Sequence, residues 1–450
     1  MGHGRRPPHR HRGIRGTDGE GRRPLAGRAR MSTALGKDLP LSIGTTIEAG
    51  GVDLLSWSFV QDPYATYEKL REEGAVRRHV VKTLATELHA WVVTDYENGR
   101  ALLADPRLSK DAVNLPAVVT AQSVDPDFQA TEQPRSMLFS DPPEHTRLRK
   151  LIGKAFTMRR VQKMRPWIEQ TTDALLERIV PGEEFDLVDD IALALPIYVI
   201  GNLLGVPEER FEDFKTWSGA LASVDISAEE KQKALGQAFV YLGQLVAEKR
   251  ADPGEDMVSA LIEADDDGVR LTDTELMSTI FLVMNAGYET TANMISSGVL
   301  ALLDHPDQQQ KLRADPSLIP GAVEEFLRYE SPLNLSTIRY TTSPVEVGDV
   351  TIPEGEIVFI ALMSANRDPG KYADPNRLDV TRPSAHSHLS FGHGVHHCLG
   401  APLARLEGEI VFTKLLERFP DWRLTVAPAA LEWRYTAQFR GLEKLPVRMA

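Results

Sequence analysis

The single cysteine of this 450-residue chain lies among residue types that bind metals or take part in catalysis. Cys398 belongs to the stretch FGHGVHHCLG, residues 391–400, which also holds three histidines and three glycines. A disulfide within the chain requires a second cysteine, and a buried spectator thiol does not require glycines around it. The interpretations that remain are a metal-bound thiolate, a nucleophilic thiolate and a chance arrangement.

Two kinds of metal site fit this stretch poorly. His393 and His397 would share a helix face, but Gly392 and Gly394 disfavour a helix there, and no second cysteine completes a tetrahedral zinc site. Covalent attachment of a c-type haem requires C-x-x-C-H, which the chain lacks. A nucleophilic cysteine with a histidine base stays open as an alternative.

A haem-bound thiolate explains more of the stretch. Glycines let the backbone turn tightly and approach a flat macrocycle. The residues after Cys398, LGAPLARLEGEIVF, carry apolar side chains at helical spacing, so Cys398 lies at or just before a helix N-terminus. The helix dipole and the free N–H groups at such an end stabilise a thiolate. The pattern therefore favours a haem-thiolate ligand.

A second group suited to chemistry is the sequence AGYETT. Its acid, Glu289, is the only formally charged residue within the segment 276–303. Because burial of an unpaired carboxylate is costly, such an acid is usually paired, protonated or functional. Thr290 adds a hydroxyl, and Ala286 and Gly287 leave room against the backbone. The group is suited to hold a small polar ligand and to relay protons to it.

A long helix is expected to position this acid. Thr272 and Glu275 form a T-x-x-E capping box at its start, and His305 followed by Pro306 marks its end. A helix of about 30 residues rises roughly 45 Å, which is enough to cross a domain. The length also fits a membrane span, but polar residues interrupt the segment too often for one. We therefore expect a helix buried in protein, and no membrane partner.

The composition and the charge exclude one class of protein. Hydrophobic residues make up 42% and charged residues 26% of the chain, as is ordinary for a globular protein. Residues 1–30 hold nine arginines and two acids, a net charge of +7, which leaves −20 for residues 31–450 within the total of −13. A body this acidic repels nucleic-acid phosphates, so we expect no nucleic-acid partner. One cysteine is typical of a reducing compartment, and we expect a cytoplasmic protein.

The chain divides into a head and one large domain. Residues 1–30 are rich in Arg, Gly and Pro without apolar periodicity, so we expect them to be disordered, with Met31 as an alternative start. Residues 31–450 show mainly helical patterns, with a β-rich patch near 76–94 and a hairpin in 345–360. We predict a single, mainly α domain with small β-sheets, present as a monomer.

Taken together, these features resemble the cytochromes P-450. The haem-binding loop of that family, F-G-x-G-x-H-x-C-x-G, is matched in full. Upstream, in the family's order, AGYETT resembles its oxygen-activation segment, and E-x-x-R resembles its Glu/Arg pair. The resemblance covers roughly residues 45–450 and implies the cytochrome P-450 fold, with a long central helix over the haem. The loop positions matched are Phe391, Gly392, Gly394, His396, Cys398 and Gly400.

The resemblance implies roles for individual residues. Cys398 would be the axial ligand of the iron in haem b, and Glu289 and Thr290 would deliver protons to dioxygen, the co-substrate. Glu325, Arg328 and Arg377 would form a charge network under the cysteine loop. The other residues implied to contact the cofactor are Phe391, Gly392, Ala286 and Gly287, and at its propionates His145, Arg149, Arg339 and His396.

The implied activity is that of a haem-dependent monooxygenase. It would insert one oxygen atom into a mid-sized lipophilic substrate, by hydroxylation or epoxidation, similar to bacterial tailoring hydroxylases of polyketide, macrolide or terpenoid pathways in secondary metabolism. With no flavin or iron–sulfur motif in the chain, a ferredoxin with its NAD(P)H-driven reductase would supply the electrons. The basic run from Lys150 to Arg165 suits docking of an acidic carrier, and a solvated face explains it equally well. The alternatives are a cysteine-dependent hydrolase and a non-catalytic haem- or ligand-binding protein.

Overall fold

The computed structural model describes residues 53–54, 56–83, 86–131, 135–222, 227–436 and 438–450, and all of them belong to one compact unit, Ala49–Ala450. The predicted disordered head and the alternative start at Met31 lie outside these residues. The helices are α1 (Trp57–Gln61), α2 (Tyr64–Glu73), α3 (Tyr96–Ala104), α4 (Leu115–Gln122), α5 (Glu144–Ala155), α6 (Met158–Lys163), α7 (Arg165–Leu176), α8 (Ala194–Leu204), α9 (Phe211–Ala222), α10 (Ala228–Ala251), α11 (Met257–Glu263), α12 (Asp273–Asp304), α13 (Pro306–Ala314), α14 (Ile319–Tyr329), α15 (Leu362–Asn366) and α16 (Ala401–Arg418).

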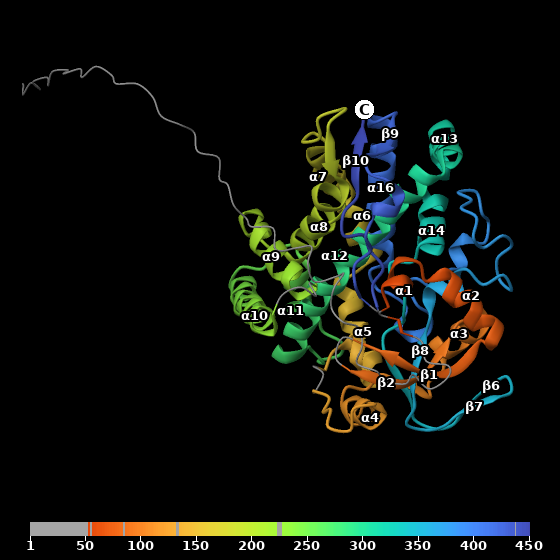
Figure 1. Cartoon of the computed structure of the whole chain (residues 1–450). Coiled ribbons are helices and arrows are strands. Elements are labelled where there is room, and N and C mark those ends of the chain that lie inside the picture. The colour runs from red at the N-terminus through yellow and green to blue at the C-terminus, as the bar shows by residue number, and fades with distance from the viewer. Residues whose placement is uncertain (1–52, 55, 84–85, 132–134, 223–226, 437) are drawn as a thin grey trace, which may run out of the picture. The chain divides into compact units, whose positions relative to one another are not determined.

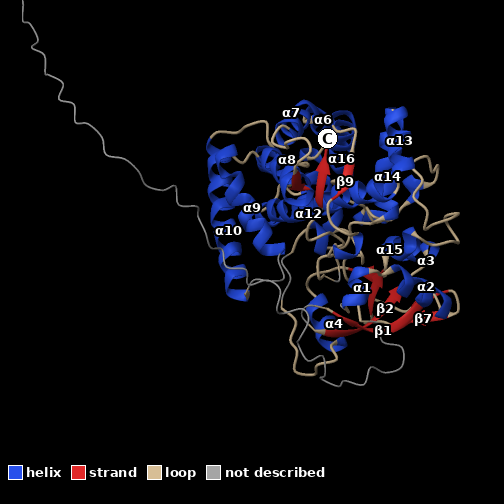
Figure 2. Ribbon diagram, turned by 45° about the horizontal axis from the view of Figure 1, so that its top comes forward, coloured by secondary structure: helices blue, strands red, loops and turns tan. Residues whose placement is uncertain are grey.

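The strands are few and short, and they form three small sheets. A five-stranded sheet has the order β1-β2-β8-β5-β3, in which only β2 and β8 run parallel. This sheet lies to one side of the helical part (Figure 2). The strands are β1 (Val76–Lys82), β2 (Glu87–Val93), β3 (Leu108–Ser109), β4 (Glu184–Asp186), β5 (Arg339–Thr341), β6 (Val345–Val347), β7 (Val350–Ile352), β8 (Ile357–Ile360), β9 (Trp422–Leu424) and β10 (Pro446–Met449). The prediction of a mainly α fold with small sheets is confirmed.

The hairpin expected in 345–360 is shorter than predicted. Strands β6 and β7 pair with each other over 345–352 only, from Val345↔Ile352 to Val347↔Val350. The β-branched run that follows, β8, leaves the hairpin and joins the large sheet between β2 and β5. All four residues of β8 are buried, which explains why a continuous apolar run serves as a central strand there.

Helix α12 passes through the middle of the helical part, between α8 and α16 (Figure 1). Its predicted capping box is formed, because Thr272 Oγ1 accepts from the Glu275 N–H at 3.3 Å and Glu275 Oε2 accepts from the Thr272 N–H at 2.8 Å. Close packing on α14 and α16 depends on Gly298, where an added Cβ would lie 2.5 Å from Phe412 Cζ. Among the described segments, we find no helix with both the length and the apolar character that crossing a bilayer requires.

Candidate functional site

The cysteine loop is closed by its own backbone. The Cys398 N–H donates to the Phe391 carbonyl oxygen at 2.8 Å. Gly392 and Gly394 have φ of +69° and +74°, in the left-handed region that residues with a side chain rarely adopt. At Gly394 an added Cβ would also lie 2.9 Å from the Cα of Ala104 on α3. These two glycines are therefore required by the turn and, at Gly394, by packing against α3.

The thiol of Cys398 lies directly before α16, which begins at Ala401. Burial raises the pKa of this thiol, while backbone N–H groups of Gly400 and Ala401 and the positive charges of Arg149 and Arg405 lower it in part. The residue is nevertheless exposed to a water-sized probe. The thiol is therefore accessible, although protein atoms around it are dense enough to raise its pKa. The prediction that Cys398 lies at a helix N-terminus is confirmed.

One face of α12 is also open. Ala286 is exposed and Thr290 is half-buried, although residues 291–299 are all buried. The Thr290 hydroxyl donates to the Ala286 carbonyl oxygen, one turn earlier, at 3.1 Å. Gly287 does not share this open face, because an added Cβ there would lie 2.5 Å from Ile200 Cδ1 of α8. The missing side chain of Gly287 thus serves helix packing against α8, and the predicted contact of Gly287 with the cofactor stays a prediction.

Glu289 is buried but not unpaired. Its Oε1 accepts from Arg434 Nη1 at 2.9 Å, and Arg434 Nη2 donates to Asn293 Oδ1 at 2.5 Å. Burial raises the pKa of Glu289, and the Arg434 charge opposes that rise. The acid is therefore directed to the C-terminal segment, away from the open face that carries Thr290. Arg434 was missed because it lies 145 residues away in sequence and no local pattern marks it.

The four residues expected at haem propionates come together. His145 on α5 is 1% exposed, its ring centroid lies 4.2 Å from that of His396, and both of its ring nitrogens lack a hydrogen-bond partner among the described residues. Arg339 on β5 is 4% exposed, and its Nε likewise has no partner there. Arg149 Nη2 donates to the His397 carbonyl oxygen at 2.7 Å. We call these residues, with Lys110, the cationic cluster.

The electrostatics of the cationic cluster show a shortage of negative charge. Burial, together with the charges of Lys110, His145, Arg339 and Arg149, lowers the pKa of His396 to about 2. Burial likewise lowers the pKa of Arg339 to about 10, with Asp141 alone opposing the shift. Buried polar groups are normally satisfied. Unpartnered nitrogens amid uncompensated positive charge therefore fit a ligand with carboxylates, as the propionates of haem would be.

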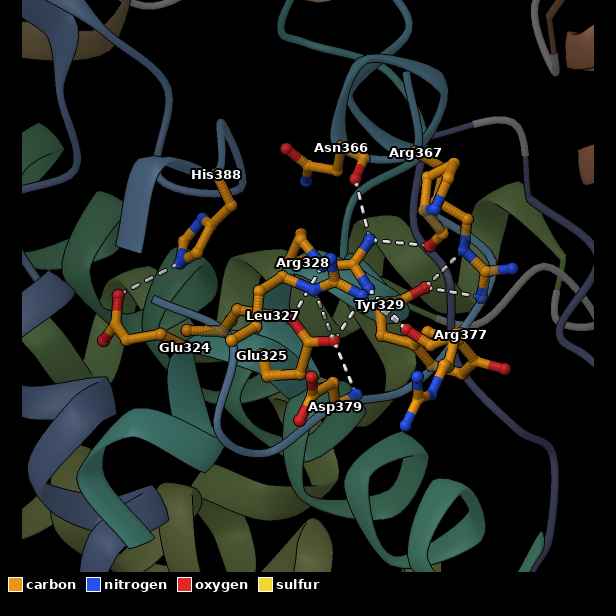
Figure 3. Close-up of polar contacts among 12 residues, drawn as sticks. Glu324, Glu325, Leu327, Arg328, Tyr329, Asn366, Arg367, Arg377, Asp379 and His388 are labelled. Carbon is orange, nitrogen blue, oxygen red and sulfur yellow. Dashed lines mark hydrogen bonds and ion pairs between the residues drawn. The ribbon is translucent and has the colours of Figure 1, made fainter. Parts of the chain in front are cut away.

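The Glu/Arg pair is fully formed (Figure 3). Arg328 Nε and Nη2 donate to the two oxygens of Glu325 at 2.7 and 2.8 Å, and both side chains are 0% exposed. The third side chain is Arg382, whose Nε donates to Glu325 Oε1 at 3.1 Å. Arg377, predicted for this place, takes part through its backbone oxygen, which accepts from Arg328 and Arg382 at 3.3 and 2.9 Å. That assignment is corrected to Arg382.

Contacts of Asn366 and of Glu324 connect this network to the cysteine loop. Asn366, whose backbone oxygen accepts from Arg328 Nη1 at 3.0 Å, binds the Leu389 N–H through Oδ1 at 2.7 Å and Ser390 Oγ through Nδ2 at 2.8 Å. Glu324 pairs with Arg405 at 2.5 Å and with His388 at 3.3 Å. The Arg405 guanidinium in turn lies 4.6 Å from the centre of the Phe391 ring. We call Glu324, Glu325, Arg328, Arg382, His388 and Arg405 the loop-support network.

Part of the basic run 150–165 is paired with acids. Lys150 and Lys154 both pair with Asp266, at 2.6 and 2.7 Å. Arg165 pairs with Glu409 at 3.1 Å. These paired cations fit the solvated-face interpretation, while docking of an acidic carrier on this run stays a prediction.

Comparison with known proteins gives consistent matches. The family model described as Cytochrome P450 matches residues 89–425. Cytochrome P450 107B1 of Saccharopolyspora erythraea is 48% identical over 403 residues, which cover 88% of this chain and 98% of the relative. The polyketide biosynthesis cytochrome P450 PksS of Bacillus subtilis is 38% identical over 399 residues, 87% of this chain and 97% of the relative. The structure of the tirandamycin C-bound P450 monooxygenase TamI aligns with a TM-score of 0.80 at 45% identity and covers 89% of this chain and 100% of that one.

Proposed function

The chain belongs to the cytochrome P450 family, and we propose that this P450 monooxygenase holds haem b through Cys398 and inserts one atom of dioxygen into a mid-sized lipophilic molecule of secondary metabolism. The family implies a haem-iron cofactor. The observation that carries the assignment of its ligand is the Cys398 thiol, accessible yet enclosed, at the start of α16. Donor groups at that helix end and two arginines favour the thiolate form that binds iron.

The cationic cluster is suited to hold the other end of the cofactor. His145, Arg149, Arg339 and His396 come from different segments, and their buried nitrogens lack protein acceptors or lie among other cations. Two carboxylates would neutralise the cluster through charge-assisted hydrogen bonds. Phe391 and Gly392 border the thiol through the loop that Cys398 closes.

When bound, the haem iron would supply the chemistry, namely the reductive activation of dioxygen and the insertion of one oxygen atom into a C–H bond or a double bond. We assign Thr290 the direct handling of a proton at its Oγ1, since this hydroxyl lies on the open face of α12. The Arg434 charge favours the ionised form of Glu289, against burial, which raises the pKa of this acid. It would pass a proton only after its carboxylate leaves that guanidinium.

The substrate class is proposed from two apolar segments, one at Val113 and one at 137–139, and from the relatives. Met137, Leu138 and Phe139 are half-buried, and Val113 is 55% exposed. Such partly exposed apolar side chains are suited to line the binding site of an apolar ligand. One relative acts, by its name, in polyketide biosynthesis, which supports a tailoring hydroxylation or epoxidation here. A ferredoxin and its reductase are the proposed electron source, and the single cysteine supports work in the reducing cytoplasm.

A cysteine-dependent hydrolase is not favoured. Such an enzyme needs a histidine base that withdraws the proton of the thiol. The groups that act on the pKa of Cys398 are backbone N–H groups and two arginines, and no histidine of the described segments is among them. A non-catalytic haem carrier would not need the hydroxyl of Thr290 on an open helix face.

The test is the carbon-monoxide spectrum of the reduced, purified protein. We expect the red-shifted Soret band that a thiolate-bound haem iron gives, and we expect Cys398→Ala to abolish it. His393→Ala, in the same loop but without contact to the thiol's donors, should keep the band. A band that survives in Cys398→Ala would assign the ligand to another residue.

A further inference from the structure

Lys110 is one of the largest fully buried side chains in the described structure, at 1% exposure. It follows β3 directly, and β3 pairs with β5 in the register Leu108↔Thr341 and Ser109↔Tyr340. The next position across from Lys110 is therefore Arg339. Lysine is almost never fully buried unless its ammonium group is paired. The question is what pairs with this one.

The acid near Lys110, Asp141, already accepts other hydrogen bonds. Within the described segments, Asp141 is the carboxylate that acts on the Lys110 charge. One of its oxygens accepts from Ser109 Oγ at 2.5 Å, and the other accepts from the Lys110 backbone N–H at 3.1 Å. The Asp141 carbonyl oxygen also accepts from the His145 N–H at 2.9 Å, which fixes this turn to the start of α5. Asp141 thus places the Lys110 backbone beside the cationic cluster, while the contacts of its carboxylate in the described structure go to Ser109 Oγ and to the Lys110 backbone rather than to the ammonium group.

The remaining neighbours are positive. Burial and the Arg339 charge hold the pKa of Lys110 well below its usual range. The Lys110 charge acts in turn on His145, whose ring centroid lies 4.2 Å from that of His396. A lysine buried among these cations tends to lose its proton, and it keeps its charge only if an anion joins them. The aliphatic stem is buried too, so the group does not reach solvent.

We infer that Lys110 is a fifth propionate-binding residue, whose ammonium group donates to a haem carboxylate beside Arg339. This inference rests on the proposed haem site and adds to it a cation that the motif resemblance does not contain. Two carboxylates supply enough acceptors for all five residues of the cationic cluster. Lys110 would then be charged and satisfied in the holoprotein.

Haem retention tests the inference without reference to activity. Holoproteins of the parent, Lys110→Met, Lys110→Gln and Lys110→Arg are mixed with excess apomyoglobin, and the rate of haem transfer is followed by absorbance. Loss of a charge-assisted hydrogen bond predicts transfer faster by roughly tenfold or more for Lys110→Met and Lys110→Gln. Lys110→Arg should retain haem nearly as well as the parent. Lys69→Met, at an exposed helical lysine, is the matched control and should match the parent.

The reduction potential gives a second reading. Removing a positive charge beside the cofactor favours ferric over ferrous iron, so the midpoint potential should fall in Lys110→Met and Lys110→Gln but not in Lys69→Met. Both readings are taken without substrate, which separates a propionate from a substrate carboxylate as the partner of Lys110. If haem transfer and potential match the parent and only ligand affinity changes, Lys110 serves the substrate and the inference is wrong.

The proposed function and the role of Lys110 can be overturned separately. A parent protein that carries no thiolate-bound haem would overturn both the proposed function and this inference. A parent with the expected carbon-monoxide band, together with Lys110→Gln that keeps its haem as tightly, would overturn only the role of Lys110. Lys110→Gln removes the positive charge but keeps a polar side chain, so it serves where Lys110→Met fails to fold.

Discussion

The loop-support network and the cationic cluster both contact the cysteine loop, yet their charges are arranged in opposite ways. In the loop-support network each acid has a cation in direct contact, as in the pair of Glu325 with Arg328 at 2.7 Å. In the cationic cluster, five side chains that can carry positive charge lie together. Among the described residues, Asp141 is the acid that acts on Lys110, His145 and Arg339, and its carboxylate accepts hydrogen bonds from Ser109 and the Lys110 backbone.

This difference separates a structural site from a ligand site. A buried network that pairs all of its charges needs nothing from outside, and it rigidifies the segment it holds. A buried group of like charges is incomplete without a ligand, because the desolvation cost of its members is not offset within the chain. Perturbed ionisable groups occur in both kinds of site. The balance of charge, rather than the size of any pKa shift, distinguishes them.

The largest effect is expected from opening the loop-support network. Arg328→Ala would leave the Glu325 carboxylate fully buried with only Arg382 as a side-chain partner. Breaking a buried pair in this way costs about 3–5 kcal/mol. We expect the free energy of unfolding, measured by urea denaturation, to fall by that amount and the yield of holoprotein to drop.

Arg377→Ala is the matched control, since its exposed side chain lies on the same loop and its backbone oxygen alone joins the network. Its effect on unfolding should stay within about 0.5 kcal/mol. An equal loss in both variants would return the third place in the network to the Arg377 side chain.

The next effect concerns α12, where a buried, paired side chain is next to a side chain on the open face. Glu289 is paired with Arg434, whereas the Thr290 hydroxyl lies on the open face. Positioned acid–base groups contribute about 10²- to 10⁴-fold in rate. Thr290→Ala should therefore lower product formed per electron roughly tenfold or more, with haem content and spectra unchanged. Reductant consumed, peroxide released and hydroxylated product are measured together, once a substrate is in hand.

Thr291→Ala is the control for this variant. Thr291 is 3% exposed and makes the same bond to the backbone one turn earlier, to the Gly287 oxygen at 3.1 Å. Its coupling of electrons to product should match the parent. Should Thr290→Ala stay as tightly coupled as Thr291→Ala, the open face would have no part in proton delivery.

The smallest effect is a pH dependence of stability that the loop-support network should cause. Burial alone would raise the pKa of Glu324, but hydrogen bonds and charge from His388 and Arg405 lower it to about 2, from a usual value of 4.5. A carboxyl whose pKa is depressed by folding stabilises the protein above its unfolded pKa and loses that contribution as pH falls toward the folded value. The unfolding midpoint should thus be higher in the parent than in Glu324→Gln at pH 7.

That difference, on the order of a few degrees, should shrink as the pH is lowered from about 5 to 3. Glu73→Gln, at an exposed acid that pairs with Lys69 at 3.8 Å, should show no such trend. A gap between the parent and Glu324→Gln that stays constant over this range would mean that Glu324 is not ionised by its partners.

Several elements could be predicted from the sequence because their contacts are local. The two partners of the capping box, Thr272 and Glu275, are three positions apart in sequence, and so are Glu325 and Arg328. Helix geometry alone therefore brings each pair together. The glycines around Cys398 likewise act within one loop. The tertiary contacts of Gly287 had no such signal, because a glycine in a helix does not reveal which neighbour approaches it.

The sequence by itself determined the cysteine loop, the long central helix and the Glu/Arg pair, since each depends on spacings that secondary structure converts directly into distances. Only the tertiary structure decided that Arg382 rather than the Arg377 side chain binds Glu325, that Arg434 holds Glu289, and that Lys110 joins the cationic cluster. The partners of Arg434 and Lys110 lie between 29 and 286 residues away in sequence. For Lys110 the two limits are Phe139 and His396. The path of a loop or the register of β3 on β5 sets such contacts, and these depend on the packing of the whole fold.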